Sequence, residues 1–138
     1  MSNLVRLSLS LEDSLLNKLS GLVKDGGYEN RSEYVRDLIR EHLVKKQWDA
    51  DCPVLGTVTL VYNHHQRGLT EKLIHLQHHC GEHILASTHV HLSHEICAEM
   101  IMLTGSSEGI RRFVNQLKKL RGVLHAELAM SSTGEDLS

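Results

Sequence analysis

Hydrophobic and polar residues alternate along residues 4–11, which is the pattern of a half-buried β-strand. One face of this strand would be apolar. The opposite face would carry Arg6, Ser8 and Ser10. The strand has no obvious partner nearby in the chain, and its backbone donors and acceptors must pair somewhere.

Two helices are predicted to follow. Ser10 with Asp13 resembles a capping box, apolar residues then recur at helical spacing, and the glycines at 26–27 end the first helix. A second helix opens at Asn30, again in a cap-like sequence, and its apolar stripe runs toward Trp48. Residues 1–48 are too few for a comfortable independent core. We therefore expect two copies to pair their strands as an antiparallel ribbon over four helices.

The second half has a different pattern. After a polar joint at 49–53, which holds the only proline, strand-like and helix-like stretches follow in the order of a ferredoxin-like split unit. The expected strands are 54–62, 84–92, 96–103 and 123–130, and the expected helices are 69–79 and 107–120. The fold class is therefore α+β, with domains at 1–48 and 54–131 and a polar tail at 132–138.

Composition narrows the class of protein. The 138 residues are 41% hydrophobic and 23% charged, which excludes a disordered or collagen-like chain. No apolar run approaches the roughly 20 residues of a membrane span, and the N-terminus is unlike a signal peptide, so we expect a cytoplasmic protein with no membrane partner. The net charge of −2 restricts any nucleic-acid contact to a few local points.

Eleven histidines stand out, nine of them between His64 and His94. In a hairpin centred near His94, Cys97 would lie opposite His91 and Glu99 opposite His89, with paired Cβ atoms about 5 Å apart. We expect Val90 and Leu92 to face the core. The side chains of His89, His91, Cys97 and Glu99 would then form one surface patch. His89, His91 and Cys97 can reach one metal ion, with Glu99 orienting an imidazole.

A fourth ligand could come from His78, at the end of the preceding helix, either within the chain or from a second one. Three imidazoles with one thiolate suit tetrahedral zinc or square-planar nickel or copper. Five further histidines could bind excess metal weakly, but we expect them to be solvated surface residues. Cys80 is either an extra ligand or a site of oxidation. The histidines in question are His64, His65, His75, His83 and His94.

Through about residue 130 the chain resembles the nickel-responsive transcription regulator (NikR) family. The resemblance rests on the alternating strand at 6–11, the turn at 27–33 into the second helix, Gln77-His78-His79, and the string at 88–99, which reads THVHLSHEICAE. It implies a ribbon-helix-helix DNA-binding domain, an ACT-like regulatory domain, and a homotetramer that binds a palindromic operator in double-stranded DNA. It also implies repression of nickel-uptake genes when nickel is bound.

The resemblance assigns roles to individual residues. One Ni(II) per subunit would be held by His89, His91 and Cys97 with His78 of a neighbouring subunit. Glu99 and Tyr62 would support the metal ligands, and Glu33 and Asp37 would form a monovalent-cation site. The residues that would contact DNA are Arg6, Ser8, Ser10, Asn30, Arg31 and Arg67. Serines 8 and 10 replace residues that are often threonine in the family, so the operator can differ.

Four other functions compete with this interpretation. The chain could sense zinc, cobalt or copper, or it could sense an amino acid through its ACT-like half. A metal-storage or metal-chaperone protein would not need the amphipathic ribbon. An enzyme is disfavoured, because a closed four-ligand site leaves no open coordination position and no general base is matched to one.

Overall fold

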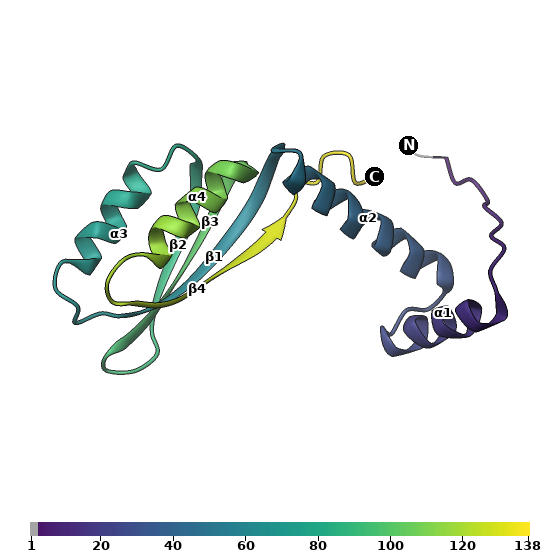
Figure 1. Ribbon diagram of the computed structural model, residues 1–138, viewed down its shortest axis with the longest axis horizontal. Coiled ribbons are helices and arrows are strands. Elements are labelled where there is room, and N and C mark those ends of the chain that lie inside the picture. Colours follow the sequence, from purple (N-terminus) through teal and green to yellow (C-terminus); the bar gives the residue numbers. More distant parts are fainter. Residues whose placement is uncertain (1–2) are drawn as a thin grey trace. The chain divides into compact units, whose positions relative to one another are not determined.

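The computed structural model describes residues 3–138, in two compact units. The first unit contains residues up to Leu43 together with Asp136–Ser138, and the second is Val44–Glu135. Figure 1 labels the elements along the chain, which are α1 (Asp13–Asp25), α2 (Arg31–Asp49), β1 (Pro53–Asn63), α3 (Leu69–His78), β2 (His83–His91), β3 (Ile96–Ser106), α4 (Ser107–Lys118) and β4 (Val123–Ser131). None of the helices within these residues is long and apolar enough to cross a membrane.

The first unit has almost no interior of its own. Residues 3–12 form no strand in the single chain, and α1 buries none of its residues. The strand predicted at 4–11 keeps its alternation but lacks a partner for its backbone groups. Leu7 is 79% exposed and Ile39 on α2 is 54% exposed. This unit therefore exposes apolar surface that its own residues do not cover.

The start of α1 differs from the prediction. Glu12, not Ser10, occupies the N-cap position, and no side chain caps this helix. At its other end, α1 stops at Asp25 as predicted, and Gly27 adopts a φ of 71°, which a glycine reaches without strain. The cap of α2 is as expected, because the Asn30 Oδ1 accepts the backbone N–H of Glu33 at 3.0 Å.

The second unit has the predicted ferredoxin-like order. Its four strands form an antiparallel sheet in the order β2-β3-β1-β4, and α3 and α4 lie together on one face (Figure 1). The central pair, β1 and β3, runs in register from Pro53–Ser106 to Asn63–Ile96. This pairing brings the residues that follow β1 next to the β2–β3 turn.

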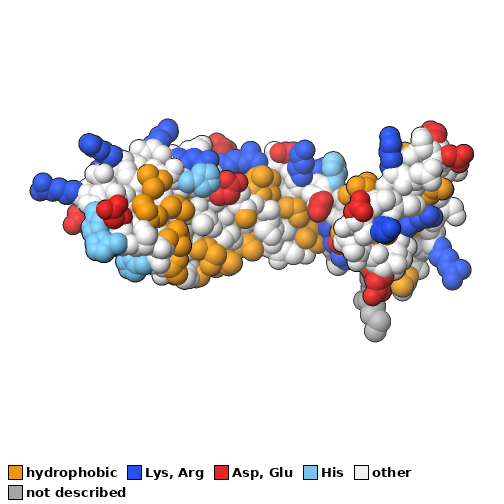
Figure 2. All heavy atoms as spheres, turned by 90° about the horizontal axis from the view of Figure 1, so that it is seen from below, with side chains coloured by type: hydrophobic (Ala, Val, Ile, Leu, Met, Phe, Trp, Pro, Cys, Tyr) orange, Lys and Arg blue, Asp and Glu red, His pale blue; other side chains and the backbone are white. Residues whose placement is uncertain are grey.

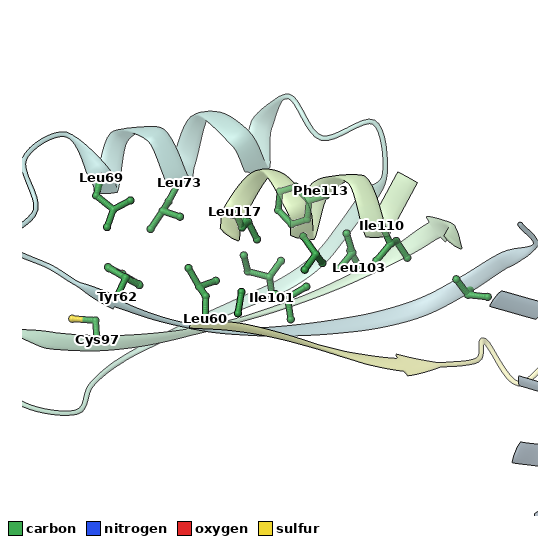
Figure 3. Close-up of a cluster of buried hydrophobic side chains, with 14 of the residues drawn as sticks. Leu60, Tyr62, Leu69, Leu73, Cys97, Ile101, Leu103, Ile110, Phe113 and Leu117 are labelled. Atoms are coloured by element: carbon green, nitrogen blue, oxygen red, sulfur yellow. The ribbon is translucent and has the colours of Figure 1, made fainter. Parts of the chain in front are cut away.

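The core lies between the sheet and the two helices (Figure 3). Leu69 and Leu73 of α3 point toward the sheet, and on α4 Ile110, Phe113 and Leu117 do the same. These positions match the apolar spacing seen in the sequence. The buried set continues along β1 and β3 to Tyr62 and Cys97, so the core reaches the end of the sheet at which the β2–β3 hairpin turns.

Neither α3 nor α4 lies over the other face of the sheet (Figure 1). Hydrophobic side chains gather on this side of the unit (Figure 2). The strand register puts Val90 and Met100 on the face opposite to the buried Cys97 and Ile101, and they are 48% and 42% exposed. Leu92, just beyond β2, is 60% exposed. The prediction that Val90 and Leu92 face the core is therefore wrong. The alternating pattern predicts which residues of a strand share a face, but it does not predict which of the two faces the helices cover.

The joint and the tail are held by polar contacts. Asp51, at a φ of 55°, accepts the backbone N–H of Glu108 in the first turn of α4 at 2.8 Å. The Trp48 Nε1 donates to the Ser131 carbonyl at 2.8 Å. The Gln47 Nε2 donates to the Glu135 carbonyl at 3.0 Å. The polar residues after β4 are thus bonded to side chains near the end of α2.

Candidate metal centre

The β2–β3 hairpin has the predicted register. Cys97 lies opposite His91, and Glu99 lies opposite His89. The hairpin turn is closed by hydrogen bonds from the Leu92 and Ser93 N–H groups to the Ile96 carbonyl, at 2.9 and 3.1 Å. Opposed residues share one face of a sheet, so all four metal-site candidates of the hairpin are on the same side.

That side is the helix-covered one, which corrects the expectation of a surface patch. Cys97 has the same parity as Ile101 and Leu103, and all three are fully buried. His89 and His91 are nevertheless exposed, because β2 is the edge strand and most of it is open to solvent. The centre therefore has a buried sulfur at its inner end and accessible imidazoles at its outer end.

Short contacts connect these side chains. The Cys97 Sγ lies 3.2 Å from the His91 Nδ1. The Tyr62 hydroxyl lies 2.9 Å from the His89 Nδ1, and the two histidine rings meet edge to face with centroids 5.0 Å apart. Burial, with the nearby charges of Glu99 and Cys97, raises the pKa of Tyr62 to about 12, so this hydroxyl keeps its proton at neutral pH.

Glu99 connects the hairpin to α3. One of its carboxylate oxygens, Oε1, accepts hydrogen bonds from the Gln77 Nε2 at 3.0 Å and from the Ser87 Oγ at 2.7 Å. The imidazole-orienting contact expected of Glu99 is instead made by Tyr62. Glu99 holds the residue directly before His78, and in this way the end of α3 is attached to β3.

His64 is the residue that sequence reasoning missed. Its ligand nitrogen, that of His91 and the Cys97 sulfur all lie within 4.8 Å of one another. The β1–β3 pairing brings His64 there, and its backbone N–H donates to the Glu95 carbonyl at 2.9 Å. Partial burial, with the neighbouring His65 and His91, lowers the pKa of His64, which favours the neutral ring that a metal needs. Only the pairing of two strands distant in sequence could have revealed it.

His78 lies apart from this group. It is exposed at the end of α3, and within residues 3–138 it does not join the cluster of His64, His91 and Cys97. The thiol and imidazoles of the cluster match the donor set of nickel, copper or zinc, and one further donor would complete a four-coordinate site. The chain's own residues thus fit a transition metal.

The DNA-binding candidates lie mostly in the first unit. Arg6, Ser8 and Ser10 are exposed on the segment before α1. The Arg31 Nη2 donates to the Ser20 Oγ at 3.2 Å and so ties the start of α2 to α1. In the second unit, Arg67 is exposed in the turn before α3.

The two carboxylates considered for a cation lie one turn apart on α2. Asp37 accepts from the Tyr28 hydroxyl at 2.9 Å and lies 3.7 Å from Arg40. The contact with Asp37 raises the pKa of Tyr28. Glu33 is half-buried, and its backbone is held by Asn30.

Two family models match the chain. Residues 55–131 match the NikR C terminal nickel binding domain, and residues 5–46 match the ribbon-helix-helix protein, copG family. The chain belongs to the NikR family. The matches agree with the α+β fold, in which a ribbon-helix-helix unit precedes the ferredoxin-like unit, and make the protein a nickel-binding, nickel-responsive DNA-binding regulator and not an enzyme.

Full-length relatives agree with this membership. The chain is 42% identical to a protein of Syntrophus aciditrophicus over 98% of both chains, and 43% identical to one of Solibacter usitatus over 99% of both. A protein of Pyrococcus abyssi is 39% identical over 98% of this chain and 99% of its own. Each is named "Putative nickel-responsive regulator". Among solved structures, the ACT domain from GTP pyrophosphokinase of Chlorobium tepidum aligns with a TM-score of 0.49 at 14% identity, over 56% of this chain and 99% of that one.

Proposed function

We propose that this NikR-family protein, with nickel bound, represses nickel-uptake genes by binding a palindromic operator as a homotetramer. One Ni(II) per subunit would be held by His89, His91 and Cys97 with His78 from a neighbouring subunit. Tyr62 and Glu99 would support these ligands. The observation that carries the proposal is the contact of Cys97 with His91 across the hairpin, beside the His89–Tyr62 contact.

A ligand from a second chain is favoured by two features. His78 is exposed and follows Gln77, whose amide is held by Glu99. The open apolar face around Met100 also needs a covering surface, which subunit association would supply. The alternative fourth donor is His64 of the same chain, which already lies near Cys97 and His91.

The DNA-binding part of the proposal rests on the exposed segment before α1. Paired in two copies, the segments would place Arg6, Ser8 and Ser10 on one surface of a ribbon, and a two-fold ribbon suits a palindromic site. Asn30 and Arg31 would hold phosphate near the start of α2, and Arg67 would contact the DNA backbone. Glu33 and Asp37 would bind a monovalent cation.

The test is a nickel-dependent gel shift with DNA from upstream of the protein's own gene and of nearby transport genes, which footprinting would then map. We expect Cys97→Ala to lose the thiolate-to-nickel absorption and the nickel-dependent shift. Arg6→Ala should keep nickel binding and relax operator choice, at about 1–3 kcal/mol per base contact. Persistence of tight nickel binding and of the absorption in Cys97→Ala would show that the ligand set is wrong.

The fourth ligand is tested separately. Under this proposal, His78→Ala changes the nickel spectrum and uncouples nickel binding from subunit association, while His64→Ala leaves both intact. The reverse result would place the ion within one subunit. Titration with Zn(II), Co(II), Cu(II) and amino acids in the same gel shift distinguishes a sensor of another metal or of a small molecule.

A further inference from the structure

Two exposed histidines lie four residues apart at the end of α3, away from the hairpin cluster: His75 is on the helix and His79 is its C-cap residue. His75 and His79 are stacked, with ring centroids 4.0 Å apart and an interplanar angle of 29°. Residues four apart in a helix share a face, so both imidazoles project from the same side of α3. Neither belongs to the cluster of His64, His91 and Cys97.

The proton on one of these rings has a defined acceptor. The His79 Nδ1 lies 2.9 Å from the His75 backbone carbonyl, and only a protonated Nδ1 can donate to that oxygen. The neutral ring then carries its lone pair on Nε2. Metal-bound histidines are commonly fixed in this way, with one ring nitrogen donating to a carbonyl and the other free for the ion. The Nε2 of His79 can therefore bind an ion without a change of tautomer.

The surroundings of the pair are open and carry charges of both signs. His75 borders a shallow groove together with Glu71, Lys72, Leu76 and Leu120. Glu71 precedes His75 by one turn and contributes a negative charge, which the adjacent Lys72 partly offsets. The two imidazoles, rather than the surrounding charges, must therefore supply the binding affinity for the ion.

We propose that His75 and His79 form a second transition-metal site, in which two imidazoles bind one divalent ion and water completes the coordination. Imidazole donors suit Ni²⁺, Cu²⁺ and Zn²⁺, with Cu²⁺ bound most strongly. An ion bound to both rings would connect His75 to His79, which flank His78 in sequence, and so stabilise the last turn of α3. The site itself is independent of the proposed function, and only this effect on His78 rests on it.

The test is a titration of the full-length chain, labelled with ¹³C-histidine, with Ni²⁺ as nickel chloride. Thiolate absorption monitors the hairpin centre, and the ring signals of His75 and His79 monitor the second site. We expect these two signals to shift or broaden together once the hairpin centre is filled. In His79→Ala the His75 ring should need at least about tenfold more nickel to respond, because chelation is lost.

His83→Ala is the matched control, since His83 is an exposed histidine just beyond α3. It should leave the paired response unchanged. The proposal is overturned if the His75 ring responds equally in wild type and His79→Ala, if neither ring responds while extra nickel binds, or if His83→Ala abolishes the response. Absence of thiolate absorption would count against the proposed function and not against the second site. The ring signals of His75 and His79 would still report binding at the second site.

Discussion

Tyr62 joins the core to the metal centre. Its side chain is 2% exposed among the core residues of β1 and β3, and its hydroxyl contacts His89. A residue of this kind determines the orientation of a neighbouring imidazole without being a ligand itself. A substitution at Tyr62 therefore tests the contact that orients His89 without removing a proposed metal ligand.

We expect Tyr62→Phe to weaken nickel binding by about 10–100-fold, because His89 loses the group that fixes its ring. Thiolate absorption at saturating nickel should persist, since Cys97 is untouched. Competition with a chelator measures the affinity. Tyr34→Phe is the control, because Tyr34 packs edge-on against Tyr28 in the first unit, with ring centroids 5.2 Å apart. Unchanged affinity in Tyr62→Phe would rule out the orienting role.

Tyr62 also predicts a pH dependence of stability. Burial, with Glu99 and Cys97, raises its pKa in the folded chain to about 12, whereas an unfolded tyrosine ionises near about 10. The stabilising contribution is complete below about pH 10 and is lost as pH rises toward about 12. Urea unfolding between pH 9 and 12 should therefore show a shallower decline for metal-free Tyr62→Phe than for wild type. Equal slopes would contradict this assignment.

At the scale of elements, periodicity and turn residues were enough to predict every helix and the strands of the sheet. The helix expected at 69–79 forms as Leu69–His78, and the hairpin register around His94 is as predicted. Both are local features of the chain. The face of the sheet that the helices cover, and the approach of His64 to Cys97, depend on pairing between distant strands, which local patterns do not encode.

The start of α4 shows how polar contacts define an element. Ser106 is its N-cap and accepts the Gly109 N–H at 3.0 Å. The Glu82 carboxylate in turn accepts the Ser106 N–H at 2.9 Å and lies 3.3 Å from the Ser106 Oγ. We expect Glu82→Ala to lower the free energy of unfolding by about 1–2 kcal/mol, because both contacts are lost.

Glu108→Ala is the control for this prediction. Glu108 lies in the first turn of the same helix, but its ion pair with Arg112, at 3.7 Å, is open to solvent. Such a pair contributes little, so its loss should cost less than about 0.5 kcal/mol. Chemical unfolding of both variants provides the comparison, and equal losses would mean that Glu82 does not support the cap.

At the scale of the whole molecule, two apolar surfaces within residues 3–138 are exposed in the single chain. One is the alternating segment before α1, which forms no strand in the single chain. The other is the helix-free face of the sheet (Figure 2). The homotetramer proposed above would cover both. Assembly is therefore expected to complete the fold of the first unit as well as the metal centre.

A charge on the open face tests this expectation. We expect Met100→Lys to weaken subunit association by about 2 kcal/mol or more, because a buried unpaired charge is costly at an interface. Sedimentation analysis should show smaller species, and nickel affinity should fall with the loss of the neighbouring His78. Asn115→Lys adds the same charge to an exposed position of α4 and should leave assembly intact. An unchanged mass in Met100→Lys would exclude this face as an interface.

The depth of Cys97 imposes an order on ligand engagement. His89 and His91 can be reached from water, whereas the sulfur has no exposed surface. With the proposed ligand set, an ion from solvent would reach the two imidazoles directly, whereas it would reach the Cys97 sulfur only if the hairpin or its surroundings moved. The rates of nickel uptake and release would then depend on how readily the hairpin opens, and not only on the strength of the bonds to the ion.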